Sequence, residues 1–274
     1  MEFTKVRLDI DDAVAVITMN DPASMNAMGI EMLQGMNEAL EYIEVEENGI
    51  RAVVLTGEGR GFCSGANLNP GSGGGAATAA AGGGGNAARP DAGAALETGY
   101  HPVLRRLREL NVPIVTAVNG AAAGVGMSFA LMGDMVIAED SSYFLQAFRR
   151  IGLVPDGGST WILPRLVGTK RAMELSLLGE KLPADKALDW GLINRVVPDG
   201  TALDAAKELA KELSEGPTTT LSMIRDLYWQ SFENSYEEQI HQERKAQRIA
   251  GRTADFIEGV TAFLQKRKAN FTGK

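Results

Sequence analysis

Cysteine and histidine are nearly absent from this chain of 274 residues. Cys63 is the only cysteine, so no disulfide can form within the chain; we expect a small packing residue and a reducing, cytoplasmic setting. The two histidines, His101 and His241, lie outside the glycine-rich turns. The sequence has no GxSxG, HExxH, CxxC or Walker motif. These absences argue against a serine-hydrolase triad, a zinc site and a P-loop, and we predict no metal.

Long apolar runs and excess positive charge are missing as well. No segment is apolar enough to span a bilayer, and the first twenty residues lack the pattern of a signal peptide. Lysine and arginine number 27 against 35 acidic residues, a net charge of −8. We therefore expect no nucleic-acid partner, and a phosphate-bearing ligand would need local cations. The hydrophobic fraction of 45% and the charged fraction of 23% are ordinary for a globular protein.

Two turns built from small residues each follow a predicted buried strand. The apolar run 114–118 is followed by small residues from Gly120 to Gly126, and then by a predicted helix over 127–132. A similar turn, 57–68, follows the apolar run 52–56. Small residues allow close approach to the backbone, and a helix start offers free N–H groups to an anion. Together the turns could supply two donors to one oxygen, although a strand–helix packing corner has the same pattern.

The order of the predicted elements divides the chain near Asp199. Residues 1–198 alternate strands with helices, which is typical of an α/β protein with a largely parallel sheet. The segments 3–10 and 14–19 predict an initial hairpin. Residues 199–274 predict a helical appendage, with helices over 203–213, 218–229, 236–249 and 253–267. Thirteen of the fifteen residues in 71–85 are glycine or alanine, which predicts either a mobile lid or a tolerated surface insertion.

Two alternatives concern single motifs. The turn 120–126 resembles the glycine motif of short-chain dehydrogenases, and Asp140 follows about twenty residues later. However, roughly a hundred residues precede that turn, and no tyrosine is followed by lysine four positions on. Asp156 lies between a proline and two glycines, where a carboxylate can serve a turn or cap a helix.

Five segments carry a resemblance to a known family. In chain order they are similar to signature segments of the crotonase superfamily, the enoyl-CoA hydratase/isomerase group: GRGFCSGANL, PIVTAVNGAAAGVGMSFALMGDMVIA, GLVPDGGSTWILPRLVG, ALDWGLINRVV and GVTAFLQKRKANF. The resemblance covers nearly the whole chain, and the stretch 71–85 is the main departure. It implies a crotonase-like spiral of ββα units with a C-terminal helical trimerisation appendage, and homotrimers that often pair into hexamers.

The same resemblance implies a ligand and a set of site residues. The substrate would be an acyl-CoA thioester, so coenzyme A belongs to the substrate and no separate cofactor is expected. The N–H groups of Ala66 and Val125 match an oxyanion hole, whose donors are worth about 2.7–4 kcal/mol each. The implied substrate-binding residues are Ala27, Ala66, Asn67, Leu68, Gly124, Val125 and Phe148, with Phe263 and Lys268 from a neighbouring subunit's C-terminal helix.

The side chains around this site set the implied reaction. Hydratases of the family use two glutamates to activate water, and Ser128 and Phe148 occupy the matching positions here. Asp156 matches a catalytic carboxylate of several isomerases, and its segment is similar to the ring-opening isomerase group of phenylacetate degradation. We predict an enoyl-CoA or epoxyphenylacetyl-CoA-type isomerase in which Asp156 moves one proton beside an apolar Phe148. A 2-enoyl-CoA hydratase is the alternative; a non-catalytic acyl-CoA binder and an RNA-binding member are more remote.

Overall fold

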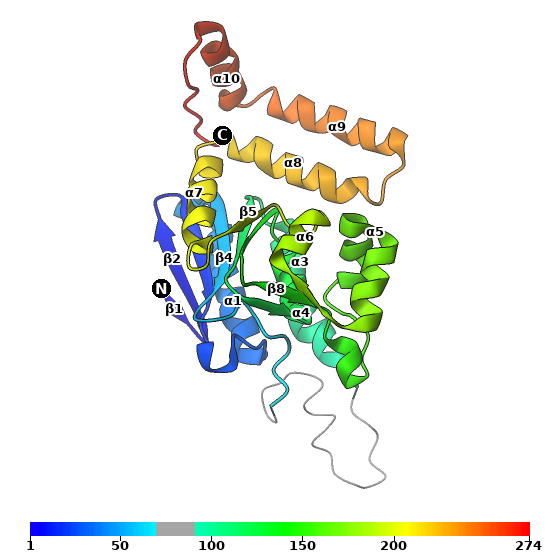
Figure 1. The fold of residues 1–274 in the computed structure, drawn as a ribbon. Coiled ribbons are helices and arrows are strands. Elements are labelled where there is room, and N and C mark those ends of the chain that lie inside the picture. The colour runs from blue at the N-terminus through cyan, green and yellow to red at the C-terminus, as the bar shows by residue number, and fades with distance from the viewer. Residues whose placement is uncertain (70–90) are drawn as a thin grey trace.

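The computed structural model describes residues 1–69 and 91–274. The stretch 71–85, for which we predicted a lid or an insertion, lies outside the described residues. Within the described part, seven strands form one sheet in the order β1-β2-β3-β4-β5-β7-β10, and β6, β8 and β9 form a second sheet (Figure 1). The strands of the large sheet are β1 (Glu2–Phe3), β2 (Val6–Asp11), β3 (Val14–Met19), β4 (Ala52–Gly57), β5 (Ile114–Val118), β7 (Met135–Glu139) and β10 (Arg195–Val197).

The sheet is parallel except at its N-terminal edge. The β2–β3 hairpin and the short strand β1 are antiparallel, whereas β3, β4, β5, β7 and β10 run parallel. The hairpin prediction is confirmed, but its first strand divides in two because the chain turns back at Lys5, where φ is 56°. The α/β class with a largely parallel sheet is therefore confirmed, and the carboxyl ends of the parallel strands meet at one edge.

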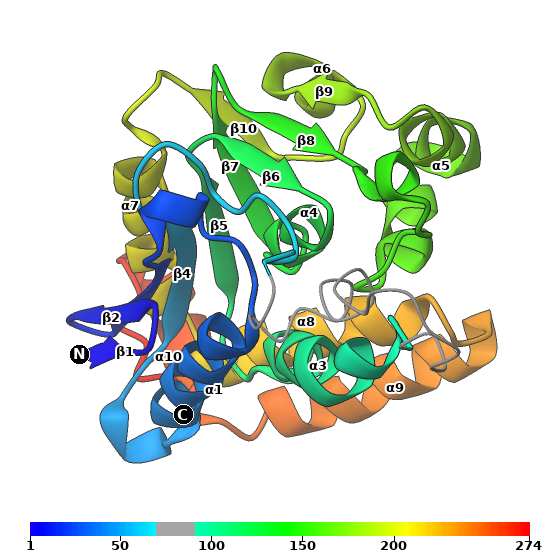
Figure 2. The same cartoon turned by 90° about the horizontal axis from the view of Figure 1, so that it is seen from below.

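Both faces of the sheet are buried because side chains alternate along each strand. On β3, Val14 and Val16 pack with helix α7 (Ala202–Ser214), whereas Ala15 and Ile17 face the opposite core. Figure 2 shows α7 on one side of β4 and β5, with α1 (Ile30–Glu44), α3 (His101–Glu109) and α4 (Val125–Ala130) on the other side. The π-helical η3 (Leu96–Tyr100) lies on that opposite side as well.

The small-residue segment after β5 is a strand, which our prediction of a plain turn missed. Residues Ala121–Ala123 form β6, which pairs with β8 (Tyr143–Leu145), and β8 pairs with β9 (Lys181–Pro183). Alanine alone gives little strand propensity, so tertiary pairing decides this element. The following helix α4 accordingly begins at Val125, two residues before the predicted start.

The remaining helices complete the outside of the molecule. Helix α5 (Ser159–Leu178) is one element, bent at Gly168 where φ is 78°. The four predicted C-terminal helices are all present; α7 packs on the sheet, α8 and α9 lie side by side, and α10 lies beyond them (Figure 1). Among the described residues, no helix is long and apolar enough to cross a membrane. The helices on the outside of the molecule have these bounds: η1 (Pro22–Ser24), η2 (Glu46–Asn48), η4 (Phe148–Ile151), α5 (Ser159–Leu178), α6 (Ala184–Asp189), α8 (Thr218–Ser231), α9 (Tyr236–Ala250) and α10 (Ala254–Gln265).

Candidate active site

The two predicted turns lie side by side because backbone hydrogen bonds join them. The Cys63 N–H donates to the Ala121 carbonyl at 2.9 Å, and the Ala123 N–H donates to the Cys63 carbonyl at 2.9 Å. Gly65 and Gly124 have φ values of 108° and 53°, a backbone region that disfavours residues with a Cβ. A Cβ on Gly65 would also lie 3.1 Å from the Ala123 carbonyl oxygen. Small residues therefore permit this close approach of the two turns.

The N–H groups of Ala66 and Val125 take no part in this pairing of the two turns. Met28 pairs with the chain on either side of Ala66: its N–H donates to Gly65 O at 2.8 Å, and its carbonyl accepts from Asn67 N–H at 2.7 Å. Val125 is the first residue of α4, where no intrahelical acceptor exists for its N–H. Within residues 1–69 and 91–274, neither N–H donates a hydrogen bond. Two adjacent turns thus each carry an unused donor.

A cavity of about 230 Å³ lies over these donors. Of the predicted residues, the structure brings together at its wall Ala66, Leu68, Gly124, Val125, Phe148 and Asp156. Ala27 and Asn67 are buried in the segments next to Met28 and Ala66 rather than at the wall. Phe263 and Lys268 belong to the C-terminal segment away from this cavity: Phe263 is 82% exposed, and Lys268 Nζ lies 2.7 Å from a Glu215 carboxylate oxygen.

Asp156 supplies the carboxylate of the cavity. Burial raises the pKa of this carboxyl to about 6. Among the described residues, its Oδ1 is buried without a hydrogen-bond partner. Helix α5 has Gly158 as its N-cap with no side-chain cap, so the interpretation of Asp156 as a capping residue is wrong. A half-buried carboxylate with an uncommitted oxygen can accept a proton near neutral pH.

The two positions where hydratases would hold glutamates behave differently. Phe148 is buried at the cavity wall, and its ring atom Cζ lies 3.8 Å from the position that a Cβ on Gly124 would take. Ser128 does not line the cavity: it is fully buried behind it, and its hydroxyl donates to the Asp156 carbonyl at 3.1 Å. Among the described lining residues, Asp156 is the only carboxylate. Arg150 also lines the cavity, but its guanidinium donates to Gly179 O at 2.6 and 3.0 Å.

Tyr100 is a cavity residue that the sequence analysis did not single out. Its hydroxyl donates to the Met28 carbonyl at 2.8 Å, the same oxygen that accepts from Asn67 N–H. Burial, with smaller effects from Asp156 and Cys63, raises the pKa of the phenol. Burial likewise raises the pKa of the Cys63 thiol to about 12, so that residue stays protonated and packs in the core. Only the spacing of apolar residues in its helix hinted that Tyr100 faces inward.

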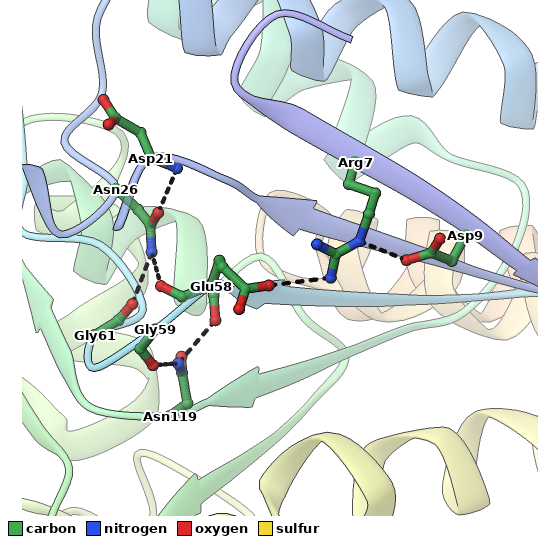
Figure 3. Close-up of polar contacts among 9 residues, drawn as sticks. Arg7, Asp9, Asp21, Asn26, Glu58, Gly59, Gly61 and Asn119 are labelled. Atoms are coloured by element: carbon green, nitrogen blue, oxygen red, sulfur yellow. Dashed lines mark hydrogen bonds and ion pairs between the residues drawn. The ribbon is translucent and has the colours of Figure 1, made fainter. Parts of the chain in front are cut away.

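Asn26 ties together the segments beneath the site (Figure 3). Its amide nitrogen donates to Glu58 O at 3.0 Å and Gly61 O at 2.8 Å, and its amide oxygen accepts from Asp21 N–H at 2.9 Å. Its φ of 56° is a left-handed conformation that asparagine tolerates better than most residues. The Asn119 amide adds bonds to two further carbonyls in the turn after β4. Position in a turn was the only sequence signal for Asn26.

In the described part of the chain, a largely parallel α/β fold carries two unpaired backbone donors and one carboxylate at the same cavity, an arrangement typical of enzymes that stabilise an oxyanion and move a proton. Among residues 1–69 and 91–274, no cluster of histidine, cysteine or acidic side chains could hold a metal ion. The sequence profile of the enoyl-CoA hydratase/isomerase family matches residues 9–274. The chain belongs to this family of acyl-CoA enzymes.

Individual relatives match over the full length. The 1,2-epoxyphenylacetyl-CoA isomerase of Escherichia coli K12 is 43% identical over 274 residues, and a probable enoyl-CoA hydratase of Rhodobacter capsulatus is 39% identical; both alignments cover 100% of each chain. The crystal structure of a putative enoyl-CoA hydratase/isomerase from Mycobacterium abscessus superposes with a TM-score of 0.88 at 33% identity, covering 98% of this chain and 100% of that one. The crotonase-like fold is thereby confirmed.

Proposed function

We propose that this chain is an acyl-CoA isomerase of the enoyl-CoA or epoxyphenylacetyl-CoA type. The observation that carries the proposal is that Asp156 is the single carboxylate among the described residues that line the cavity formed by the Ala66 and Val125 turns. Water activation of the hydratase kind uses two carboxylates, whereas a shift of one proton needs one. The identity of 43% to an enzyme named as an isomerase supports the same choice.

The proposed reaction on a 3-enoyl-CoA moves one proton and one double bond. The Ala66 and Val125 N–H groups donate to the thioester oxygen, which makes the C2 proton acidic. Asp156 takes that proton, and the electrons of the C2–H bond form the C1–C2 double bond of a dienolate. Asp156 then returns the proton to C4, while the electrons shift to leave a C2–C3 double bond. The overall change conserves all atoms and requires no separate redox cofactor.

The environment of Asp156 supports this role. An ordinary aspartate is almost fully ionised at neutral pH and binds protons weakly. With its pKa raised to about 6, Asp156 is ionised at neutral pH yet basic enough to carry the proton. The buried Phe148 ring beside the cavity keeps that surface apolar. We further propose that the coenzyme A moiety runs along Ala27 and the segment 66–68.

A 2-enoyl-CoA hydratase is the second candidate, because the relative from Rhodobacter capsulatus carries that name at 39% identity. A panel of 2-enoyl, 3-enoyl and ring-1,2-epoxide CoA esters distinguishes the two, with products identified by mass and NMR. An isomerase gives products of unchanged mass from the 3-enoyl or epoxide esters. A gain of 18 mass units, one water, from the 2-enoyl esters alone would establish the hydratase instead. Binding of every ester without turnover would point to a non-catalytic acyl-CoA binder.

A further inference from the structure

A chain of buried hydrogen bonds ends on the backbone carbonyl of Asp156. The Gln146 amide nitrogen lies 3.3 Å from Ser159 Oγ, Ser159 Oγ lies 2.7 Å from Ser128 Oγ, and Ser128 Oγ lies 3.1 Å from Asp156 O. The side chains of Ser128, Ser159 and Gln146 are fully buried. None of these three lines the cavity of about 230 Å³. This chain of hydrogen bonds therefore lies behind the cavity wall.

The order of donors in this chain follows from counting hydrogens. Ser128 has one hydroxyl hydrogen, which it donates to the Asp156 carbonyl, so Ser159 must donate to Ser128. Ser159 in turn accepts from the Gln146 amide, which has no lone pair to offer on nitrogen. In all three bonds the donor is therefore the group nearer Gln146 and the acceptor is the group nearer the Asp156 carbonyl. Bonds aligned in one direction in a dry interior strengthen one another.

Packing adds a second constraint on the same turn. Gly157 has a φ of 60°, and a Cβ at this position would lie 2.7 Å from Ser128 Cβ. The turn after Asp156 thus rests directly on Ser128. The Ser159 N–H also donates to the Asp156 carbonyl at 3.1 Å. Two donors converge on this carbonyl oxygen, whereas the carboxylate Oδ1 has no partner among the described residues. Anchoring of Asp156 thus comes from its backbone, and its carboxylate stays available.

We propose that Ser128 is a positioning residue, whose hydroxyl fixes the Asp156 backbone so that the carboxylate enters the cavity opposite the Ala66 and Val125 turns. This inference rests on the proposed function, since it assigns Asp156 the proton transfer. It gives Ser128 a role distinct from that of the glutamate at the matching position of hydratases. Displacement of a reacting group by about 1 Å can lower the rate about 100-fold, so a small relaxation of this turn would be measurable.

The test compares Ser128→Ala with Ser142→Ala. Ser142 is a matched control because its buried hydroxyl also donates to a backbone carbonyl, Val118 O at 2.9 Å, away from the cavity. Both substitutions should lower the melting temperature by similar amounts. We expect only Ser128→Ala to lower kcat, by about 10- to 100-fold with KM within about twofold. Equal kcat in both variants would overturn the proposal. Ser159→Ala, which removes the middle of the chain, should give a smaller loss of kcat, and it serves as the probe if Ser128→Ala does not fold.

A pH profile and a double variant separate positioning from general stability. The other ionisable side chains at the described cavity wall are Tyr100 and Arg150, and His101 lies near Gly157 in the adjoining cavity. In Ser128→Ala the acidic limb of kcat/KM should move to lower pH as the loosened carboxylate gains hydration. In an Asp156→Asn background, Ser128→Ala should cause no further loss of kcat. If the double variant loses kcat by the product of the two single-variant factors, positioning through Asp156 is overturned. If Asp156→Asn is fully active, the proposed function itself is overturned.

Discussion

Burial makes Asp156 chemically different from the other aspartates of the chain. Its carboxylate lies in a partly apolar cavity with Oδ1 unpartnered among the described residues, so the ionised form loses solvation without gaining a counter-ion. Burial is accordingly the cause of its raised pKa. The oxygens of a carboxylate that serves only a turn would accept hydrogen bonds from local N–H groups. The site therefore holds this group in a reactive form.

Replacement of Asp156 by asparagine should abolish most isomerase activity. The amide keeps the size of the side chain but cannot accept the proton, so we expect kcat to fall about 10²- to 10⁴-fold with little change in substrate binding. Steady-state kinetics on a 3-enoyl-CoA ester measure this. Asp140→Asn is the matched control, since Asp140 is exposed and belongs to the rejected dinucleotide motif. Parent-like turnover in Asp156→Asn would exclude the carboxylate as the base.

The raised pKa also predicts two pH effects. As a base Asp156 must be ionised, so kcat/KM of the parent should fall as the pH drops below about 6. In the unfolded chain the carboxyl keeps an ordinary pKa, so folding favours its protonated form. The contribution of Asp156 to stability is thus fully present below about pH 4 and is lost as the pH rises through about 6. Asp156→Asn should therefore melt above the parent at pH 8, with the difference narrowing toward pH 4; a variant less stable at pH 8 would contradict this.

The Val125 N–H can be removed without removing the helix. Val125 is the first residue of α4, a position where proline is tolerated because its missing N–H has no intrahelical acceptor. We expect Val125→Pro to lower kcat about 10²- to 10³-fold, the effect of one lost oxyanion donor. Val125→Ala, which retains the N–H, is the control. Circular dichroism checks the fold, and a folded proline variant with a normal rate would make this turn purely structural.

At the scale of elements, backbone pairing and buried polar groups fix the site. The bridge between Cys63 and Ala122 holds the two turns together, and Asn26 fastens the segment before Ala27 to the turn after β4. Helix α8 is joined to the core by Arg225, whose guanidinium donates to Asp134 at 2.5 Å and to the carbonyls of Leu107 and Leu110. Helix α8 is thus joined by a buried cation to the end of α3 and to the turn before β7.

Removal of Arg225 should destabilise the protein strongly. Burial raises the pKa of the Asp134 carboxyl and the Arg225 charge opposes that rise, so loss of the cation leaves a buried acid uncompensated. We expect Arg225→Met to lower the free energy of unfolding by about 3–5 kcal/mol. Denaturant unfolding measures the change. The exposed Arg195 provides the control, because Arg195→Met should change stability by no more than about 0.5 kcal/mol. Equal effects in the two variants would show that the buried pair contributes little.

For the whole molecule, the C-terminal helices present apolar side chains that no other described part of the chain covers. Along α10, Phe256 and Val260 are partly exposed and Phe263 is 82% exposed; the three residues are spaced four and three positions apart in the sequence. Exposed apolar patches of this kind mark interaction surfaces. We propose that these helices form the interface of a homotrimer, or of a hexamer made from two trimers, and that Phe263 and Lys268 reach the coenzyme A of a neighbouring subunit.

Assembly can be tested at α10. Phe263→Asp replaces the most exposed aromatic side chain of this helix with a charged one. We expect this change to shift the protein toward monomers. Light scattering at micromolar concentration measures the mass of parent and variant. Leu188→Asp, at an exposed apolar residue of α6 outside the C-terminal helices, is the control. A parent protein that is a stable monomer would contradict the proposed assembly, whatever the variant does.

Much of this organisation could be predicted from residue order. Short apolar runs identified the buried strands β4 and β5, and the periodic spacing on the C-terminal side identified α7 to α10. The composition of the two small-residue turns predicted accessible backbone donors, and the family resemblance assigned these donors to Ala66 and Val125. The strand β6 was missed because three alanines carry no pattern of their own, and Tyr100 and Asn26 were missed because their partners are 72 residues away and up to 35 residues away, respectively.

The sequence by itself determined the family and the α/β class, since these follow from local pattern and motif order, and it supplied the residues that we propose bear the chemistry. Only the tertiary structure decided what those residues can do. It placed Ser128 behind Asp156 rather than in the cavity, left the Ala66 and Val125 N–H groups unpaired among the described residues, and buried the carboxylate enough to raise its pKa. Solvation and hydrogen-bond pairing depend on groups brought together from distant segments, which the order of residues does not contain.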